Sequence, residues 1–333
     1  MGLFYSILAI LVLLFFIIAG AGGMGLYTLF TIIVPYAAIF LFVAGFIYRV
    51  LKWASAPVPF HIPTVSGQQK SLSWIQADNT DSPFTTGGVV KRLALEILLF
   101  RSLLKNEKIE MEAPHRLLFK TSTLLWLGAM AFHWSLLVIG VRHLRFFLEP
   151  LPACIVVLIR IDSIFQGFFR VFPVPYITDF LILIALAYLF FRRVADLQVR
   201  YISIPSDYFV LLLLGGIAIS GVLMRVFYKQ DLVQVKEWVM AMLRFQPALP
   251  KGVTLIFYVH LFFVSLLAAY FPFSKLMHMP GIFLSPTRNL TNTSRSERHV
   301  NPWNYPVKVH TYAEYEDHFR GAMKEVGLPV DKE

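Results

Sequence analysis

The chain has 333 residues, of which 57% are hydrophobic and only 15% are charged, and its net charge is +10. With a mean hydropathy of +0.65, this composition excludes a soluble globular domain and predicts an all-α, polytopic membrane protein. The positive charge indicates basic loops beside anionic lipid and not nucleic-acid binding. Cys154 is the single cysteine, which excludes an intrachain disulfide, a cysteine-ligated iron–sulfur cluster and CxxCH haem attachment within this chain.

Residues 1–52 predict a helical hairpin in the membrane. Two apolar runs, Leu3–Gly20 and Leu26–Val50, are separated by a turn of small residues. No basic segment precedes the first run, so we expect a retained helix and not a cleaved signal peptide. Arg49 and Lys52 then predict a cytoplasmic helix end.

Residues 53–115 form a polar insert. Its first part is rich in proline and cannot form a regular helix. Its second part, Val89–Lys108, is amphipathic and favours a surface helix at the membrane interface. A docking surface for a soluble electron-carrying subunit is the alternative interpretation of this helix.

Residues 116–280 predict the main helical bundle. The spanning candidates are Leu117–Val141, Tyr176–Phe191, Tyr208–Phe227 and Thr254–Pro280, and the more polar stretches Leu151–Val174 and Tyr228–Gly252 predict outer segments. Asp207 is placed to start the third span, and Gly215, Gly216 and Gly221 would let a neighbour approach it closely. With the hairpin, this gives a bundle of about six transmembrane helices.

Six spans place both termini on one side of the membrane. Most lysines and arginines fall in the segments that would share this side, so the positive-inside rule predicts that both termini are cytoplasmic. The tail, residues 281–333, is polar and contains a short helical candidate, Tyr312–Val326. It is either a solvated tail or a partner-binding arm.

Four histidines lie within two of the predicted spans. His133 and His143 are ten residues apart on one helix, and His260 and His278 are eighteen residues apart on the other. Antiparallel helices would pair His143 with His260 near one surface and His133 with His278 near the other. Opposed imidazoles across an interhelical gap are typical of non-covalent haem b ligation, so we predict two stacked b haems.

The spacing of the histidines does not match on straight helices. On continuous helices the first two are separated by a rise of about 15 Å and the last two by about 27 Å. Pro272 lies between His260 and His278 and could kink that helix.

Basic residues near the histidines are candidates for binding haem propionates or a quinone oxygen: Arg142, Arg145, Arg160 and Lys275. The alternative is that they extend toward the membrane interface. A zinc-type site is disfavoured because no carboxylate or thiolate converges with the histidines in these helices. A transporter with a histidine proton relay is the alternative from another class, and a purely structural anchor is a third.

The histidine pattern resembles a known family. The sequence PFSKLMH at Pro272–His278, with His260 upstream and a pair of histidines on an earlier helix, is similar to the gamma subunit, the membrane cytochrome b, of respiratory nitrate reductases. Arg192–Arg225 resembles that family's connection between its third and fourth spans. The extra N-terminal span and the insert, with PVPFHIPTVSGQQKSLSWI, resemble the DsrM family of diheme cytochromes b in DsrMKJOP complexes.

The resemblance implies several further expectations. The family's pattern assigns His143 and His260 to an outer haem and His133 and His278 to an inner one. It implies a menaquinone-type quinone near the outer haem and a cytoplasmic iron–sulfur partner of the heterodisulfide reductase type, similar to DsrK. It also implies the other DsrMKJOP subunits as partners and an indirect connection, through the small protein DsrC, to dissimilatory sulfur metabolism.

Overall fold

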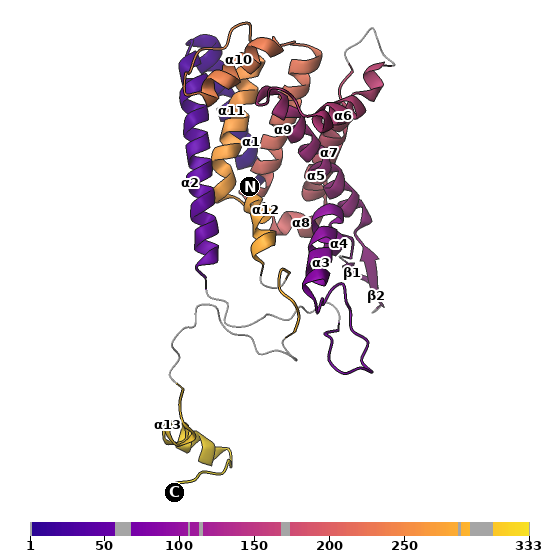
Figure 1. The fold of residues 1–333 in the computed structure, drawn as a ribbon, viewed down its shortest axis with the longest axis vertical. Coiled ribbons are helices and arrows are strands. Elements are labelled where there is room, and N and C mark those ends of the chain that lie inside the picture. The colour runs from indigo at the N-terminus through magenta and orange to yellow at the C-terminus, as the bar shows by residue number, and fades with distance from the viewer. Residues whose placement is uncertain are drawn as a thin grey trace.

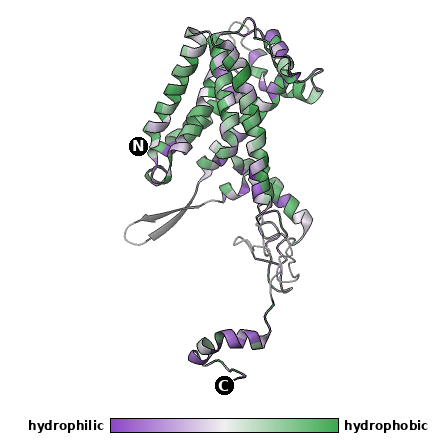
Figure 2. Ribbon diagram, turned by 90° about the vertical axis from the view of Figure 1, so that its left-hand side faces the viewer, coloured by the Kyte–Doolittle hydropathy of each residue, from purple (hydrophilic) through white to green (hydrophobic). Residues whose placement is uncertain are grey.

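The fold is a bundle of long helices with shorter elements at both of its ends (Figure 1). The computed structural model describes residues 2–56, 68–105, 107–112, 116–167, 174–285, 288–293 and 309–332. Residues 57–67, which contain Pro57, Pro59 and Pro63 of the insert, lie outside these ranges. Apolar residues dominate the long helices, whereas the C-terminal helix is largely hydrophilic (Figure 2).

The N-terminal segment forms a helical hairpin. Helix α1 (Gly2–Ile17) continues into a π-helical turn, Ile18–Gly23. The chain reverses at Gly25, whose positive φ of 65° suits a residue without a side chain. A second π-helical turn, Leu29–Ile33, leads into α2 (Val34–Ala54).

Among the described residues, five helical segments are long and apolar enough to cross a membrane. These are Gly2–Gly23, Leu29–Ala54, Thr123–Phe146, Pro205–Val226 and Leu255–Phe273. The sixth expected span is α7 (Ile177–Ala195), which carries Asp179 in its first turn and two arginines in its last turn. It contacts both α5 (Thr123–His143) and α9 (Pro205–Val226). The chain is therefore a multi-pass, helical membrane protein.

The expected helix start at Leu117 is wrong. Residues 116–121 instead form β2 (Arg116–Thr121), which pairs antiparallel with β1 (Glu107–Glu112). The sequence of β1 alternates charged and apolar residues, a period of two that favours a strand. Pairing satisfies the backbone hydrogen bonds of both segments, so α5 begins only at Thr123.

The expected single helix Thr254–Pro280 is also wrong. Helix α11 (Leu255–Tyr270) ends just before Pro272 and is followed by a 3₁₀ turn, Phe271–Phe273. Ser274 is extended, with φ −112° and ψ 176°, and its hydroxyl accepts a hydrogen bond from the backbone N–H of Leu276. A second 3₁₀ turn, Lys275–Met277, then leads into α12 (His278–Gly281). Proline removes a backbone donor and clashes with the preceding turn, which ends the regular helix here.

Two other expected helices are shorter than the sequence indicated. Val89–Lys108 is not one helix, because α3 (Thr86–Leu99) stops at Phe100 and a short α4 (Arg101–Leu104) follows. Leu151–Val174 is represented by α6 (Ala153–Asp162) and a 3₁₀ turn, Ile164–Gly167. Residues 168–173 lie outside the described ranges.

The remaining expectations for helices are confirmed. Helix α9 begins beside Asp207, whose carboxylate accepts the backbone N–H of Ile204 at 3.2 Å. The other helices are α8 (Leu197–Ile202), α10 (Leu232–Leu243) and α13 (Tyr312–Glu325).

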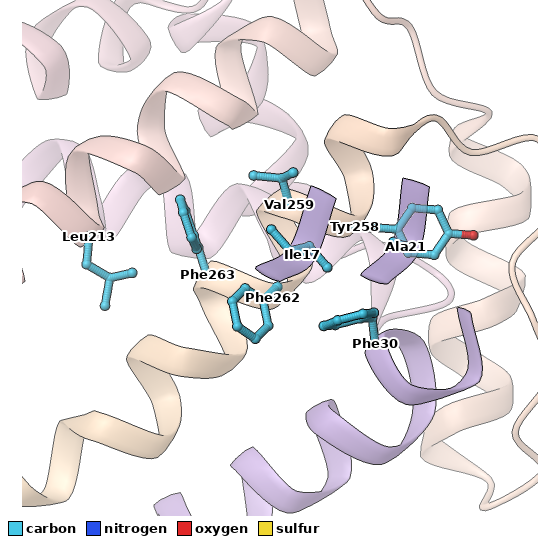
Figure 3. Packing of buried hydrophobic residues seen from close by; sticks show 8 residues of the cluster. All are labelled: Ile17, Ala21, Phe30, Leu213, Tyr258, Val259, Phe262 and Phe263. Carbon is cyan, nitrogen blue, oxygen red and sulfur yellow. The ribbon is translucent and has the colours of Figure 1, made fainter. Parts of the chain in front are cut away.

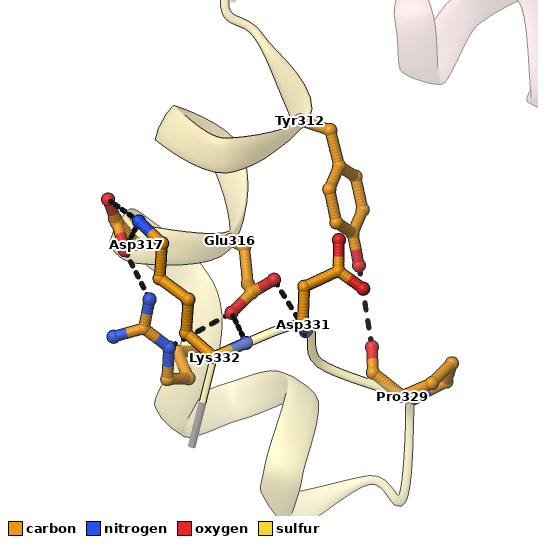
Figure 4. Close-up of polar contacts among 7 residues, drawn as sticks. Tyr312, Glu316, Asp317, Pro329, Asp331 and Lys332 are labelled. Atoms are coloured by element: carbon orange, nitrogen blue, oxygen red, sulfur yellow. Dashed lines mark hydrogen bonds and ion pairs between the residues drawn. The ribbon is translucent and has the colours of Figure 1, made fainter.

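Helix α13 folds against the chain end that follows it (Figure 4). The buried Glu316 carboxylate accepts the backbone N–H groups of Asp331 and Lys332 at 2.8 and 3.0 Å. The Tyr312 hydroxyl donates to the Pro329 carbonyl oxygen at 3.4 Å. The end of the tail is therefore a small folded unit and not a fully extended segment.

The main hydrophobic core joins the N-terminal hairpin to α11, the helix that carries His260 (Figure 3). Its buried residues are Ile17, Ala21, Phe30, Leu213, Tyr258, Val259, Phe262 and Phe263. A second cluster joins α5, α7 and α9 through Phe132, Ile182, Ala185, Leu186 and Leu214. The hairpin is thus an integral part of the bundle.

Close helix contacts depend on particular glycines. A Cβ atom added at Gly216 would lie 2.7 Å from the ring of Phe263, and one at Gly221 would lie 3.3 Å from His260. A Cβ atom at the neighbouring Gly215 would meet nothing within 4 Å. Of the three predicted glycine approaches, the structure therefore shows those at Gly216 and Gly221.

We predict that Gly216→Ala destabilises the bundle by about 1–3 kcal/mol, because the ring of buried Phe263 has to move. Gly215→Ala is the matched control and should leave stability within about 0.5 kcal/mol of the wild type, since the added methyl group meets open space. Thermal unfolding of both variants in detergent measures the difference. Equal melting temperatures for the two variants would contradict this packing.

Candidate metal centres

The four histidines meet as two facing pairs. The rings of His143 on α5 and His260 on α11 have centres 6.5 Å apart, with their planes 13° from parallel. The rings of His133 on α5 and His278 on α12 have centres 6.1 Å apart and nearly perpendicular planes, at 83°. The combinations are those that the antiparallel arrangement predicts.

The break at Pro272 accounts for the spacing mismatch. Because the chain leaves the helical path after Tyr270, His278 does not continue the rise of α11. It lies instead beside His133, which is ten residues from His143 on an unbroken helix. A straight helix would have carried His278 well past this level.

The Nδ1 atoms of all four histidines lie within hydrogen-bonding distance of backbone carbonyl oxygens. In His133 and His143 the acceptors are four residues earlier on α5, at 2.8 and 2.7 Å. In His278 the acceptor is the Lys275 carbonyl at 2.8 Å. In His260 the acceptors are the Ile217 carbonyl at 3.1 Å and the Ser220 hydroxyl at 3.0 Å, whose own proton is directed to backbone carbonyls of α9. A carbonyl can only accept, so Nδ1 carries the proton and Nε2 keeps its lone pair free for a metal.

The separation of the rings fits one metal ion between the members of each pair. Nitrogen–metal bonds of about 2 Å place the ring centres of two imidazoles on opposite sides of a metal about 6 Å apart. Among the described residues, no group of three or more His, Cys, Asp or Glu side chains could hold a metal ion. Each pair could supply two ligands to the metal of a group such as a porphyrin, whose own nitrogens would provide the other ligands.

Two aromatic rings lie against His133. Phe132 and Phe100 each lie with their ring centres 4.9 Å from that of His133. Phe132 directly precedes His133 on α5, whereas Phe100 lies in the polar insert. Its only signal in the sequence is that it follows the apolar end of an amphipathic helix.

Arg142 is buried in an ion-pair cluster next to His143. Its guanidinium donates to Asp162 at 2.8 Å and to Asp179 at 2.7 Å. Asp162 also accepts the backbone N–H and hydroxyl of Thr178 at 3.0 and 2.8 Å. The Arg142 guanidinium is therefore already paired with two protein carboxylates. The sequence had suggested Arg142 as a partner for a haem propionate or a quinone oxygen.

Two further arginines lie at the same end of the bundle. The guanidinium carbons of Arg142 and Arg225 lie 3.7 and 3.6 Å from the centre of the Tyr176 ring. The Nε atoms of Arg145 and Arg225 are buried, and in the described part of the chain they have no hydrogen-bond partner. Arg225 and Tyr176 were missed by sequence reasoning, although Arg225 is the basic residue that ends the apolar helix α9.

The other two basic candidates lie on the surface. Arg160 is exposed on α6. Lys275 is largely exposed, and its Nζ atom is 2.7 Å from Asp207. Arg145 is therefore the one of the four sequence candidates that is partly buried and not occupied by a protein carboxylate.

Facing histidine pairs inside a helical membrane bundle define a membrane cytochrome b. The nitrate reductase gamma subunit family matches residues 93–296, a range that includes all four histidines, and the chain belongs to this family. The chain is 45% identical over 282 residues to the Hdr-like menaquinol oxidoreductase cytochrome b-like subunit of Archaeoglobus fulgidus, with 83% of each chain covered. It is 40% identical over 275 residues to the subunit of the same name from Archaeoglobus profundus, with 81% of each covered.

We predict that Asp179→Ala lowers the free energy of unfolding by roughly 3–5 kcal/mol, because it leaves part of the buried Arg142 charge uncompensated. The control is Glu149→Ala, which removes the exposed ion pair between Glu149 and Lys236 and should cost less than about 1 kcal/mol. Thermal unfolding in detergent compares the two variants. A similar small loss for both would contradict the structural role of the cluster.

Proposed function

We propose that the chain is a diheme cytochrome b that passes electrons between menaquinol or menaquinone and an iron–sulfur partner subunit. The observation that carries the proposal is the two histidine pairs. In each pair the ring centres are 6.1 or 6.5 Å apart, close to the distance expected for two imidazoles that bind one metal ion. The Nδ1 atom of each histidine lies within hydrogen-bonding distance of a backbone carbonyl oxygen. His143 and His260 would hold the outer haem, and His133 and His278 the inner one. The bound haems supply one-electron redox chemistry, while the protein sets their ligands and surroundings.

Arg145 and Arg225 are the residues that we assign to the anionic or electron-rich groups beside the outer pair. Their buried Nε atoms lack protein partners among the described residues, and a guanidinium can pair a carboxylate or donate to a quinone oxygen. Arg142, Asp162 and Asp179 hold this end of the bundle in place. The assignment of menaquinol as the electron donor is supported by the names of the two relatives.

The opposite end of the bundle is the proposed cytoplasmic face. Lys52 ends α2, two arginines end α7, and Lys275 precedes α12, and these helix ends share one side in a bundle of six spans. Basic residues at these positions support cytoplasmic termini. The inner pair lies at this end, so an iron–sulfur subunit of the heterodisulfide reductase type, similar to DsrK, would exchange electrons with the inner haem.

The finer biological assignment extends this proposal. The chain would work within a DsrMKJOP-type complex and connect quinone exchange, through DsrC, to dissimilatory sulfur metabolism. The sulfur chemistry would occur on partner subunits, because Cys154 is the only cysteine here.

We predict two b haems per purified chain, measured as a pyridine haemochrome against protein concentration. His143→Ala should lose the outer haem alone and His278→Ala the inner haem alone, because each removes one axial ligand. His310→Ala, in the exposed tail, is the control and should keep both. A wild-type chain that contains no haem after haem-replete expression would exclude the proposed function.

We also predict that anaerobic menadiol, a soluble menaquinol analogue, reduces the bound haems. Arg225→Gln should slow this reduction about tenfold, because it removes a charged hydrogen-bond donor. Dithionite should still reduce both haems fully in the variant. Arg244→Gln, at an exposed arginine after α10, is the control and should react at the wild-type rate. Equal rates for Arg225→Gln and the wild type would contradict the assignment of Arg225.

A further inference from the structure

Phe100 forms the turn between two helices of the polar insert, close to the bundle. This turn is called the corner below. Phe100 joins α3 to α4 and has a left-handed backbone conformation, with φ 46° and ψ 47°. This region disfavours residues that carry a bulky side chain, and such conformations persist only where the surrounding structure imposes them. A glycine would fit this corner without strain.

Several contacts from different elements impose this conformation. The indole N–H groups of Trp126 and Trp134, both on α5, donate to the carbonyl oxygens of Leu99 and Leu98 at 2.7 and 3.1 Å. The buried Glu96 carboxylate accepts the backbone N–H of Ser102 at 3.1 Å, across the corner. The end of α3 is therefore tied to the helix that carries His133.

An ion pair holds the residue after the corner. Arg101 is paired with Asp81, which also lies 2.5 Å from the Nζ atom of Lys105. Burial alone would raise the pKa of the Asp81 carboxyl, but these two cations hold it below its ordinary value. The Asp81 carboxylate is consequently charged at neutral pH. Its ion pairs with Arg101 and Lys105 hold α4 in place after the corner.

The result of this arrangement is a direct contact with a haem-ligand candidate. The Phe100 ring lies 4.9 Å from the His133 ring, at 58° to its plane. Phe132 also contacts His133, so aromatic rings of two different elements limit the rotation of the imidazole. Phe132 belongs to α5 itself, whereas Phe100 belongs to the polar insert. The Phe100 ring therefore lies against the side of His133 that faces the insert.

We propose that Phe100 is a positioning residue for the inner haem, fixing the ring plane of His133 and shielding that half-buried imidazole from water. This inference rests on the proposed function, since it assumes that His133 and His278 hold a haem. Water that reaches a haem favours its oxidised, more positive state, so removal of the ring should lower the reduction potential of the inner haem. It should also change the angle between the two imidazole planes.

The test compares Phe100→Gly with Phe245→Gly. Both residues have a positive φ, 46° and 56°, so both substitutions relieve the same kind of backbone conformation and favour folding. Phe245 is 81% exposed and stacks on Tyr36, and its ring contacts among the described residues include none of the four histidines. Phe100→Tyr, which keeps an aromatic ring at the corner, is the conservative rescue variant.

The readouts are redox titration of the b-haem bands and the EPR spectrum of the oxidised haems. His278→Ala identifies the signals of the inner haem by their loss. In Phe100→Gly we expect a lower inner potential and a shifted inner EPR signal, or loss of the inner haem alone, with the outer haem unchanged. Phe245→Gly and Phe100→Tyr should match the wild type.

Different outcomes separate this inference from the proposed function. A wild-type chain that lacks haem overturns both. A wild-type chain with two haems, together with a Phe100→Gly variant whose two haems are unchanged or change equally, overturns only the role of Phe100.

Discussion

The break in the chain at Pro272 and Ser274 is the constraint on which the arrangement of the histidines depends. On one continuous helix, His260 and His278 would be separated by a rise of about 27 Å, whereas His133 and His143 are about 15 Å apart on α5. The break removes this difference, and both pairs face each other at similar ring separations. Pro272 is fully buried, so the break lies inside the bundle and is fixed by its surroundings.

The N-terminal hairpin supports this break. A Cβ atom at Gly45 of α2 would lie 2.7 Å from Pro272, so only a glycine lets α2 approach the break this closely. The rings of Phe42 and Phe271 meet edge to face at 5.5 Å beside it. The hairpin is therefore not a separate anchor, because it packs directly against the segment that positions His278.

Much of the helical bundle and the histidine pairs could be predicted from the sequence, because apolar length and histidine spacing are local signals. The end of α11 could be suspected from Pro272, but the extended Ser274 and the resulting position of His278 depend on tertiary packing. The strand at Arg116–Thr121 was missed because an apolar run beside a long helix reads as part of that helix. The sequence analysis missed three residues: Arg225, Tyr176 and Phe100. Each reaches the site from an element that is distant in sequence from the histidines, and no periodic pattern in the local sequence distinguishes it.

The measurement that tests the central claim most directly is the EPR spectrum of the oxidised, purified chain. Low-spin ferric haem with two imidazole ligands gives a signal whose anisotropy increases as the ring planes turn from parallel to perpendicular. The planes of His143 and His260 are 13° apart, and those of His133 and His278 are 83° apart. We therefore predict two low-spin signals in equal amounts, one rhombic and one highly anisotropic. A single low-spin signal, or high-spin haem alone, would contradict two bis-histidine centres.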